Sequence, residues 1–87
     1  MYNQLMSEEP STYIIAALSS VGITCQALDI SSYDPMVFGN LVAKAETSIG
    51  SLSIVYDRGF YVEARQTGTN IIQIVKALEQ HKKAAHA

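Results

Sequence analysis

The sequence predicts a small α+β domain in which helices cover one face of a mostly antiparallel sheet. Three observations predict it. Apolar residues recur at helical spacing near the start of the chain and again near its end, and between these two segments two alternating runs flank an Asp-Arg-Gly turn. Because 87 residues leave no room for a second core, we expect one domain over 1–87. The predicted order is α-β-β-β-β-α in two layers, with about four strands, a flexible arm at 1–6 and a flexible tail at 84–87.

The first element is predicted as a helix over roughly residues 8–21. Ser7 is a suitable N-cap, Pro10 is tolerated in a first turn, and Gly22 can close the helix in a left-handed conformation. The apolar face of this helix consists of Ile14, Ala17, Leu18 and Val21. A strand over 23–30 follows, with Ile23, Cys25, Ala27 and Asp29 predicted on one face and Thr24, Gln26, Leu28 and Ile30 on the other.

The stretch after this strand allows two interpretations. Asp34-Pro35 is typical of a helix start. Either a single turn ends at Gly39 and a strand follows over 40–48, or a helix continues to about residue 47 and the order becomes α-β-α-β-β-α. Gly39-Asn40 inside a helix would cost roughly 1 kcal/mol. We favour the strand, which places Leu41, Ala43 and Ala45 on one face.

The second half of the chain predicts a β-hairpin and a closing helix. Asp57-Arg58-Gly59 is expected to form the hairpin turn, with Gly59 supplying a positive φ. Asn70 with Gln73 is typical of a capped helix start. The apolar positions of the two alternating runs that define the hairpin are Leu52, Ile54 and Tyr56, then Phe60, Val62 and Ala64. The final helix is predicted to reach about residue 83, and its apolar stripe consists of Ile71, Ile74, Val75 and Leu78.

Composition narrows the class of partner. The chain has six Lys and Arg residues and a formal charge of −2. This balance argues against nucleic-acid binding, because proteins that bind nucleic acid usually present a basic face to the phosphates. No stretch has the length of a membrane span and no signal peptide is evident, so we expect no membrane partner and a cytoplasmic location. Apolar content of 48% against 16% charged residues indicates surface left for a protein partner or a homodimer.

No residue pattern indicates catalysis, a cofactor or a metal. Cys25 is the single cysteine, so no internal disulfide can form, and we interpret it as a small buried hydrophobe rather than a nucleophile. His81 and His86 are five positions apart near the C-terminus, which is not the spacing of a helical metal pair. No phosphate-binding loop, GxSxG or HExxH motif is present.

The candidate binding residues are Tyr56, Asp57, Arg58 and Tyr61. Asp57 and Arg58 occupy the predicted hairpin tip, where recognition residues are often displayed, but a turn-capping carboxylate and a solvated guanidinium also explain them. Tyr61 is predicted on the sheet face opposite Phe60 and Val62, and tyrosine suits protein interfaces because it joins a large ring to a polar tip.

The segments FGNLVAKAE and LSIVYDRGFYVEA resemble a pattern in small uncharacterised bacterial proteins, some of which look like immunity proteins that accompany toxins. The resemblance covers about a third of the chain, over Phe38–Ala64. It implies an α+β fold with a strand after Gly39, and it implies neither an activity nor catalytic residues. Its distinctive residues are Phe38, Gly39, Asn40, Asp57, Arg58 and Gly59.

The leading hypothesis is therefore a non-catalytic protein-interaction module, a homodimer or the partner of another protein, that binds through its sheet surface or an edge strand. A small-ligand binder or small enzyme with a pocket between helices and sheet is the alternative. Nucleic-acid binding is a distant third because of the charge balance.

Overall fold

The computed structural model describes the backbone of residues 2–37 and 39–85 and the side chains of residues 10–37 and 39–85. Phe38 and His86, both named in the sequence predictions, lie outside these described residues. Six elements follow in the order α-β-β-β-β-α, as predicted. They are α1 (Tyr2–Ser20), β1 (Cys25–Asp34), β2 (Asn40–Thr47), β3 (Gly50–Tyr56), β4 (Phe60–Ala64) and α2 (Ile71–Ala85).

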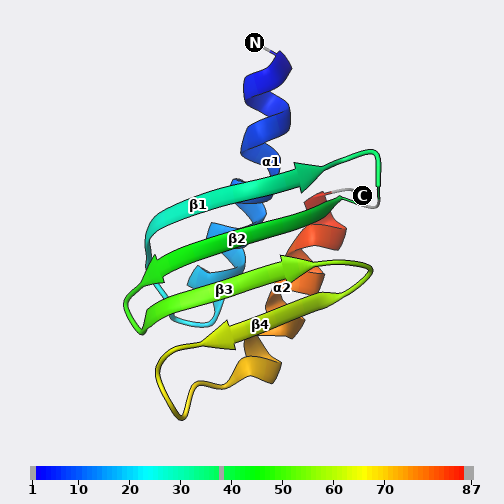
Figure 1. The fold of residues 1–87 in the computed structure, drawn as a ribbon. Helices are drawn as coiled ribbons and strands as arrows, with labels where there is room; N and C mark the ends of the chain where they lie inside the picture. The colour runs from blue at the N-terminus through cyan, green and yellow to red at the C-terminus, as the bar shows by residue number, and fades with distance from the viewer. Residues whose placement is uncertain (1, 38, 86–87) are drawn as a thin grey trace.

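The four strands form one antiparallel meander in the order β1-β2-β3-β4, and both helices lie behind the same face of it (Figure 1). Side chains alternate between the two faces along each strand. On β2 and β3 the inward set includes Leu41, Ala43, Ala45, Leu52 and Ile54, all buried. The sheet face that the helices cover is thus the core, and no helix or strand among the described residues covers the opposite face.

The core joins this inner sheet face to one side of each helix. Ile14 and Leu18 of α1 and Leu78 of α2 are fully buried, and α1 packs against α2. Alanines 17 and 77, also buried, take up little volume where the elements meet. Burying each large aliphatic side chain stabilises the fold by about 1.5–3 kcal/mol.

Helix α1 begins earlier than predicted. The helix starts at Tyr2 rather than near residue 8, so Pro10 lies inside it and not in its first turn. Proline cannot donate the backbone hydrogen bond expected at this position. Its ring is fully buried, and this packing offsets part of the loss. The N-terminal half of α1 extends past the β1 edge of the sheet (Figure 1).

Strand β1 departs from the predicted alternation because its pairing with β2 is interrupted twice. Register shifts occur between Cys25 and Ala27 and between Ile30 and Ser32. The first shift puts Leu28 and Ile30 on the same side as Cys25, whereas the sequence pattern placed them opposite. Each interruption is a β-bulge, in which one extra residue is left unpaired.

The ambiguous stretch forms a turn followed by a strand. The Asp34 carboxylate accepts from the Met36 N–H at 3.0 Å, and the Asn40 N–H donates to the Val37 carbonyl at 3.0 Å. Gly39 takes a φ of 71°, the left-handed conformation that ends the turn. The strand interpretation is confirmed by β2, and the alternative order with a third helix is wrong.

Candidate binding site at the hairpin and strand β4

The β3–β4 turn carries two of the predicted binding residues. The Asp57 N–H donates to the Gly59 carbonyl at 3.0 Å, which closes the turn around Arg58. Arg58 takes a φ of 59°, a left-handed conformation that costs a residue with a side chain roughly 1–2 kcal/mol. The prediction that Gly59 supplies the positive φ is therefore wrong. The strained backbone displays the Arg58 side chain, which is 78% exposed.

Asp57 is held on two sides. Its Oδ1 lies 3.7 Å from Arg58 Nε and accepts a hydrogen bond from Asn40 Nδ2 at 3.5 Å. The second bond links the hairpin tip to the start of β2. Because both charged side chains are largely exposed, their ion pair contributes little to stability. Asp57 thus links the turn to β2, while the Arg58 side chain keeps most of its surface exposed to a partner.

Tyr56 lines a cavity of about 590 Å³ between the hairpin and the C-terminal half of α2. Lys82 Nζ lies 4.4 Å from the centroid of the Tyr56 ring, a cation–π contact. The Phe60 ring meets Tyr56 edge-on, with centroids 4.7 Å apart. Arg58 and Lys83 add positive charge to the cavity, and its other lining residues are Gly59 and Glu79. This aromatic wall with cations beside it suits a carboxylate attached to an apolar group.

Tyr61 lies on the opposite face of the sheet, as predicted, and so does not contribute to the Tyr56 cavity. It pairs across the strands with Val55, which pairs in turn with Val42. Tyr61 is 64% exposed and Val42 44% exposed. We call Val42, Val55 and Tyr61 the outer apolar row. The next row toward the β2–β3 turn is polar and includes Lys44 and Glu63.

A groove of about 430 Å³ follows the edge of β4. It takes side chains from both faces of the strand, including Phe60 and Tyr61, and it also takes Ile71 and Val75 from the first turns of α2. The other residues that line it are Ser53, Val55, Val62 and Glu63. The groove therefore connects the outer apolar row with the inner side of the sheet.

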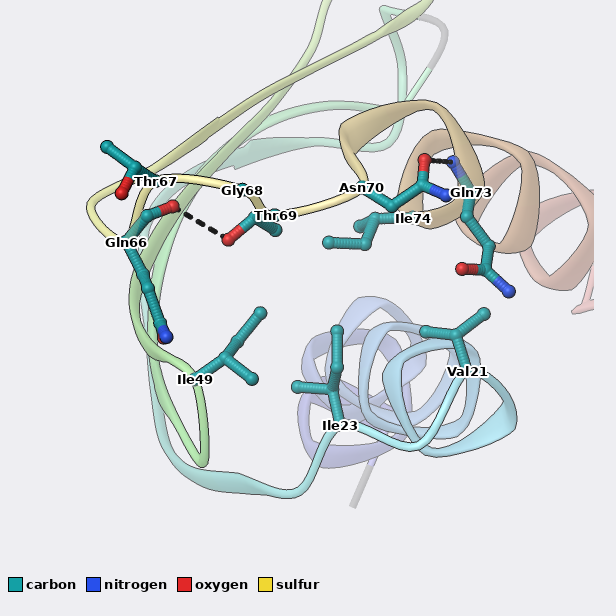
Figure 2. Close-up of a pocket in the computed structure, with 10 residues that line it drawn as sticks. All are labelled: Val21, Ile23, Ile49, Gln66, Thr67, Gly68, Thr69, Asn70, Gln73 and Ile74. Carbon is teal, nitrogen blue, oxygen red and sulfur yellow. Dashed lines mark hydrogen bonds between the residues drawn. The ribbon is translucent and has the colours of Figure 1, made fainter.

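A third recess, of about 230 Å³, lies where the end of α1 meets the β4–α2 loop (Figure 2). Its apolar side chains are Val21, Ile23, Ile49 and Ile74. Its polar side chains are neutral: Thr69 donates to the Gln66 carbonyl at 2.8 Å, and the Asn70 side-chain oxygen accepts from the Gln73 N–H at 3.1 Å. The second bond confirms the predicted helix cap. Because no titratable side chain lines this recess, its residues offer no acid–base group.

Residues with reactive or metal-binding side chains do not gather at these sites. Across the residues the structure describes, no three His, Cys, Asp or Glu side chains come together as a metal site. Cys25 is partly exposed, and burial raises the pKa of its thiol, with a weaker opposing effect from a backbone hydrogen bond with Ala27. A raised pKa keeps the thiol protonated and therefore a poor nucleophile. Within the same described part, no helix is long and apolar enough to cross a bilayer.

Comparisons with protein-family models, with curated proteins and with solved structures find no match for the chain. The structure brings Tyr56 and Arg58 together at one cavity, sets Asp57 behind the turn and places Tyr61 on the other face. Sequence reasoning missed Lys82 and Lys83 as site residues. Lysines at the end of a helix are favoured by its dipole alone, so their position in the sequence does not indicate a site, and only the packing of α2 beneath the hairpin brings them to the Tyr56 cavity.

Proposed function

We propose that this chain is a non-catalytic protein-interaction module that binds through the sheet surface and edge left uncovered by its helices. The partner is a second copy of the chain or another protein, and an immunity-like role toward a toxin is one form of the second case. The observation that carries the proposal is the outer apolar row, which continues into the groove along β4.

Physical chemistry supports this assignment. A two-layer α+β domain buries one sheet face under its helices, and the other face normally alternates polar residues toward water. Here an exposed tyrosine and an exposed valine flank Val55 in a cross-strand row, with Lys44 and Glu63 in the row beside it. An apolar centre with a charged rim is the usual arrangement of a protein interface.

Photo-crosslinking tests the proposal. A photoreactive phenylalanine replaces Tyr61, and in a matched control it replaces Thr12, an exposed residue of α1 on the helical side. In the cells that naturally make the chain, we expect protein adducts from position 61 and few from position 12. An adduct at twice the mass of the chain identifies a homodimer. Equal yields of protein adducts from both positions would contradict the proposal.

Small-ligand binding is the second candidate, and the recess of Figure 2 favours it because an apolar floor there meets a hydrogen-bonding rim. At about 230 Å³ the recess lies below the roughly 300–1,000 Å³ usual for ligand sites, so only a very small neutral molecule would fit. A fragment screen by NMR tests this role: shifts confined to Ile49, Thr69 and Gln73 would support it, and their absence would oppose it.

A further inference from the structure

In the described part of the chain, strand β4 has a row of backbone groups with no neighbouring strand beside them. In an antiparallel ladder, alternate residues exchange hydrogen bonds with the paired strand, and the residues between them direct N–H and C=O to the other side. The Arg65 N–H donates to the Ser51 carbonyl at 3.1 Å. Because the pattern repeats every second residue, Glu63 and Tyr61 also bond to β3. The residues whose N–H and C=O face the open edge are therefore Phe60, Val62 and Ala64.

The two edges of the sheet differ in regularity. Strand β1, at one edge, is bulged twice, and bulges discourage a further strand from pairing. Strand β4, at the other edge, pairs with β3 over its whole length without a register shift. Its one charged side chain, Glu63, points to the outer face, and the strand contains no lysine or proline. The β4 edge therefore lacks bulges, lysine and proline, and its protection against strand addition is limited to its short length and the single charge of Glu63.

A strand added beside β4 would find apolar contacts on its inner side. Ile71 and Val75 of α2 line the β4 groove, and Ile72 of the same turn is 70% exposed. Figure 1 shows the start of α2 extending beyond the β4 edge, where it would cover the inner face of an added strand. Because side chains of a strand alternate, every second side chain of the added segment would contact this surface.

One end of the groove is basic. Phe60 lines both the β4 groove and the Tyr56 cavity, so the two are adjoining. Beyond Phe60 the cavity presents Arg58, Lys82 and Lys83 against the single carboxylate of Glu79. This imbalance of charge complements a carboxylate on the segment that occupies the groove.

We propose that β4 receives an extended peptide segment of a partner protein as a fifth strand. Alternate apolar side chains of the segment contact Ile71 and Val75, and a carboxylate, from an acidic side chain or a chain terminus, lies near Arg58 and Lys83. This inference rests on the proposed function and deepens it, because it specifies the chemistry of the bound segment. Main-chain hydrogen bonds supply affinity, while the groove and the basic end supply selectivity.

The test uses short random peptides displayed with a free carboxyl terminus and selected on the full chain. The decisive variant is Val62→Pro, which removes an N–H at the free edge and leaves the bonds to β3 in place. We expect wild-type chain to enrich peptides with alternating apolar residues and a carboxylate at one end. The Val62→Pro variant should bind the enriched peptides at least about tenfold more weakly, because one backbone bond is lost and the proline ring blocks the edge.

Two matched comparisons separate the parts of the proposal. Amidating the terminus or changing Asp to Asn in an enriched peptide should weaken its binding to wild type, and Arg58→Ala with Lys83→Ala should remove that difference. Val62→Ala retains the N–H but shortens a side chain that lines the groove, so it should bind the enriched peptides more weakly than wild type and clearly more tightly than Val62→Pro. Failure to enrich such peptides, or equal binding by Val62→Pro, would overturn strand addition. Crosslinking at Tyr61 that persists in Val62→Pro would then show a partner on the outer face, so failure of this inference is distinguishable from failure of the proposed function.

Discussion

Proline substitution at neighbouring positions of β4 separates backbone groups bonded to β3 from those at the open edge. Glu63 pairs with Ser53 and belongs to the residues that bond to β3, whereas Val62 faces the edge. Glu63→Pro removes the donor for the Ser53 carbonyl and places a ring carbon against it. Val62→Pro removes an N–H that has no strand partner among the described residues. The two variants therefore differ in one ladder bond.

The expected magnitudes follow from this difference. Leaving a ladder carbonyl without its donor costs about 1–3 kcal/mol, and displacement by the proline ring raises the loss from Glu63→Pro to about 3 kcal/mol or more. Val62→Pro removes part of a half-buried side chain, which lowers the free energy of unfolding by about 1 kcal/mol. It also restores roughly 0.4–1 kcal/mol, because proline restricts the unfolded chain. The total free energy of unfolding of a domain of this length is roughly 4–13 kcal/mol.

Thermal unfolding followed by circular dichroism measures both variants. At about 4–8 °C per kcal/mol, Glu63→Pro should lower Tm by at least roughly 12 °C, and Val62→Pro by no more than about 8 °C. Glu63→Ala and Val62→Ala correct for the lost side chains. Equal losses from the two prolines, or a larger loss from Val62→Pro, would refute the assignment of edge-facing groups and with it the basis for strand addition.

Three further outcomes test other parts of the structure. Leu78→Ala should cost about 2–5 kcal/mol in urea unfolding because Leu78 is fully buried, and a loss below about 1 kcal/mol would contradict its place in the core. Arg58→Gly should raise Tm, since glycine adopts the left-handed φ of 59° without the strain of about 1 kcal/mol; a lower Tm would show that the Arg58 side chain stabilises the turn. Cys25 has a pKa raised in the folded chain, so the protonated thiol is favoured: its contribution to stability is fully present below the pKa of the unfolded thiol and is lost as pH rises through the folded pKa. Iodoacetamide should therefore modify the folded chain more slowly than the urea-unfolded chain at pH 8, and equal rates would count against burial of the thiol.

The elements predicted best are those whose local pattern and tertiary environment agree. In the hairpin, Leu52 and Ile54 alternate with serines, and the structure buries both. The cap at Asn70 fixes the start of α2 through one side-chain hydrogen bond that involves only neighbouring residues. Such features are encoded within a few positions, so sequence reasoning recovers them without knowledge of the fold.

The elements predicted less well depend on residues distant in the chain. The bulge after Cys25 arises from the pairing of β1 with β2, and no local alternation signals it. The helix continues through Pro10 because its ring is buried, a condition that the sequence does not state. Arg58 adopts the left-handed conformation although Gly59 follows it, so the turn geometry also escaped prediction.

The candidate site was predicted in its residues but not in its assembly. Tyr56 and Arg58 were named from the hairpin alone, and Tyr61 was placed on the correct face by alternation. Lys82 contacts the Tyr56 ring only because α2 crosses beneath the hairpin. The direction of that crossing is set by core packing and not by the sequence of either segment. Residues contributed by a second element therefore require the structure.

The different treatment of the two sheet edges bears on what the β4 edge can bind. An edge selected only to avoid unwanted pairing would carry bulges or charges, as β1 does with its two register shifts. Strand β4 has no bulge and a single charged side chain, Glu63, and its main protection is its short length, since it spans only Phe60–Ala64. Five residues offer too few bonds to assemble a sheet of many copies, yet they suffice to hold a short segment when Ile71, Val75 and a basic end add side-chain contacts. The length of β4 therefore favours a bound peptide over indefinite strand addition. Lengthening β4 should raise self-association of the chain more than it raises the affinity of the chain for peptides.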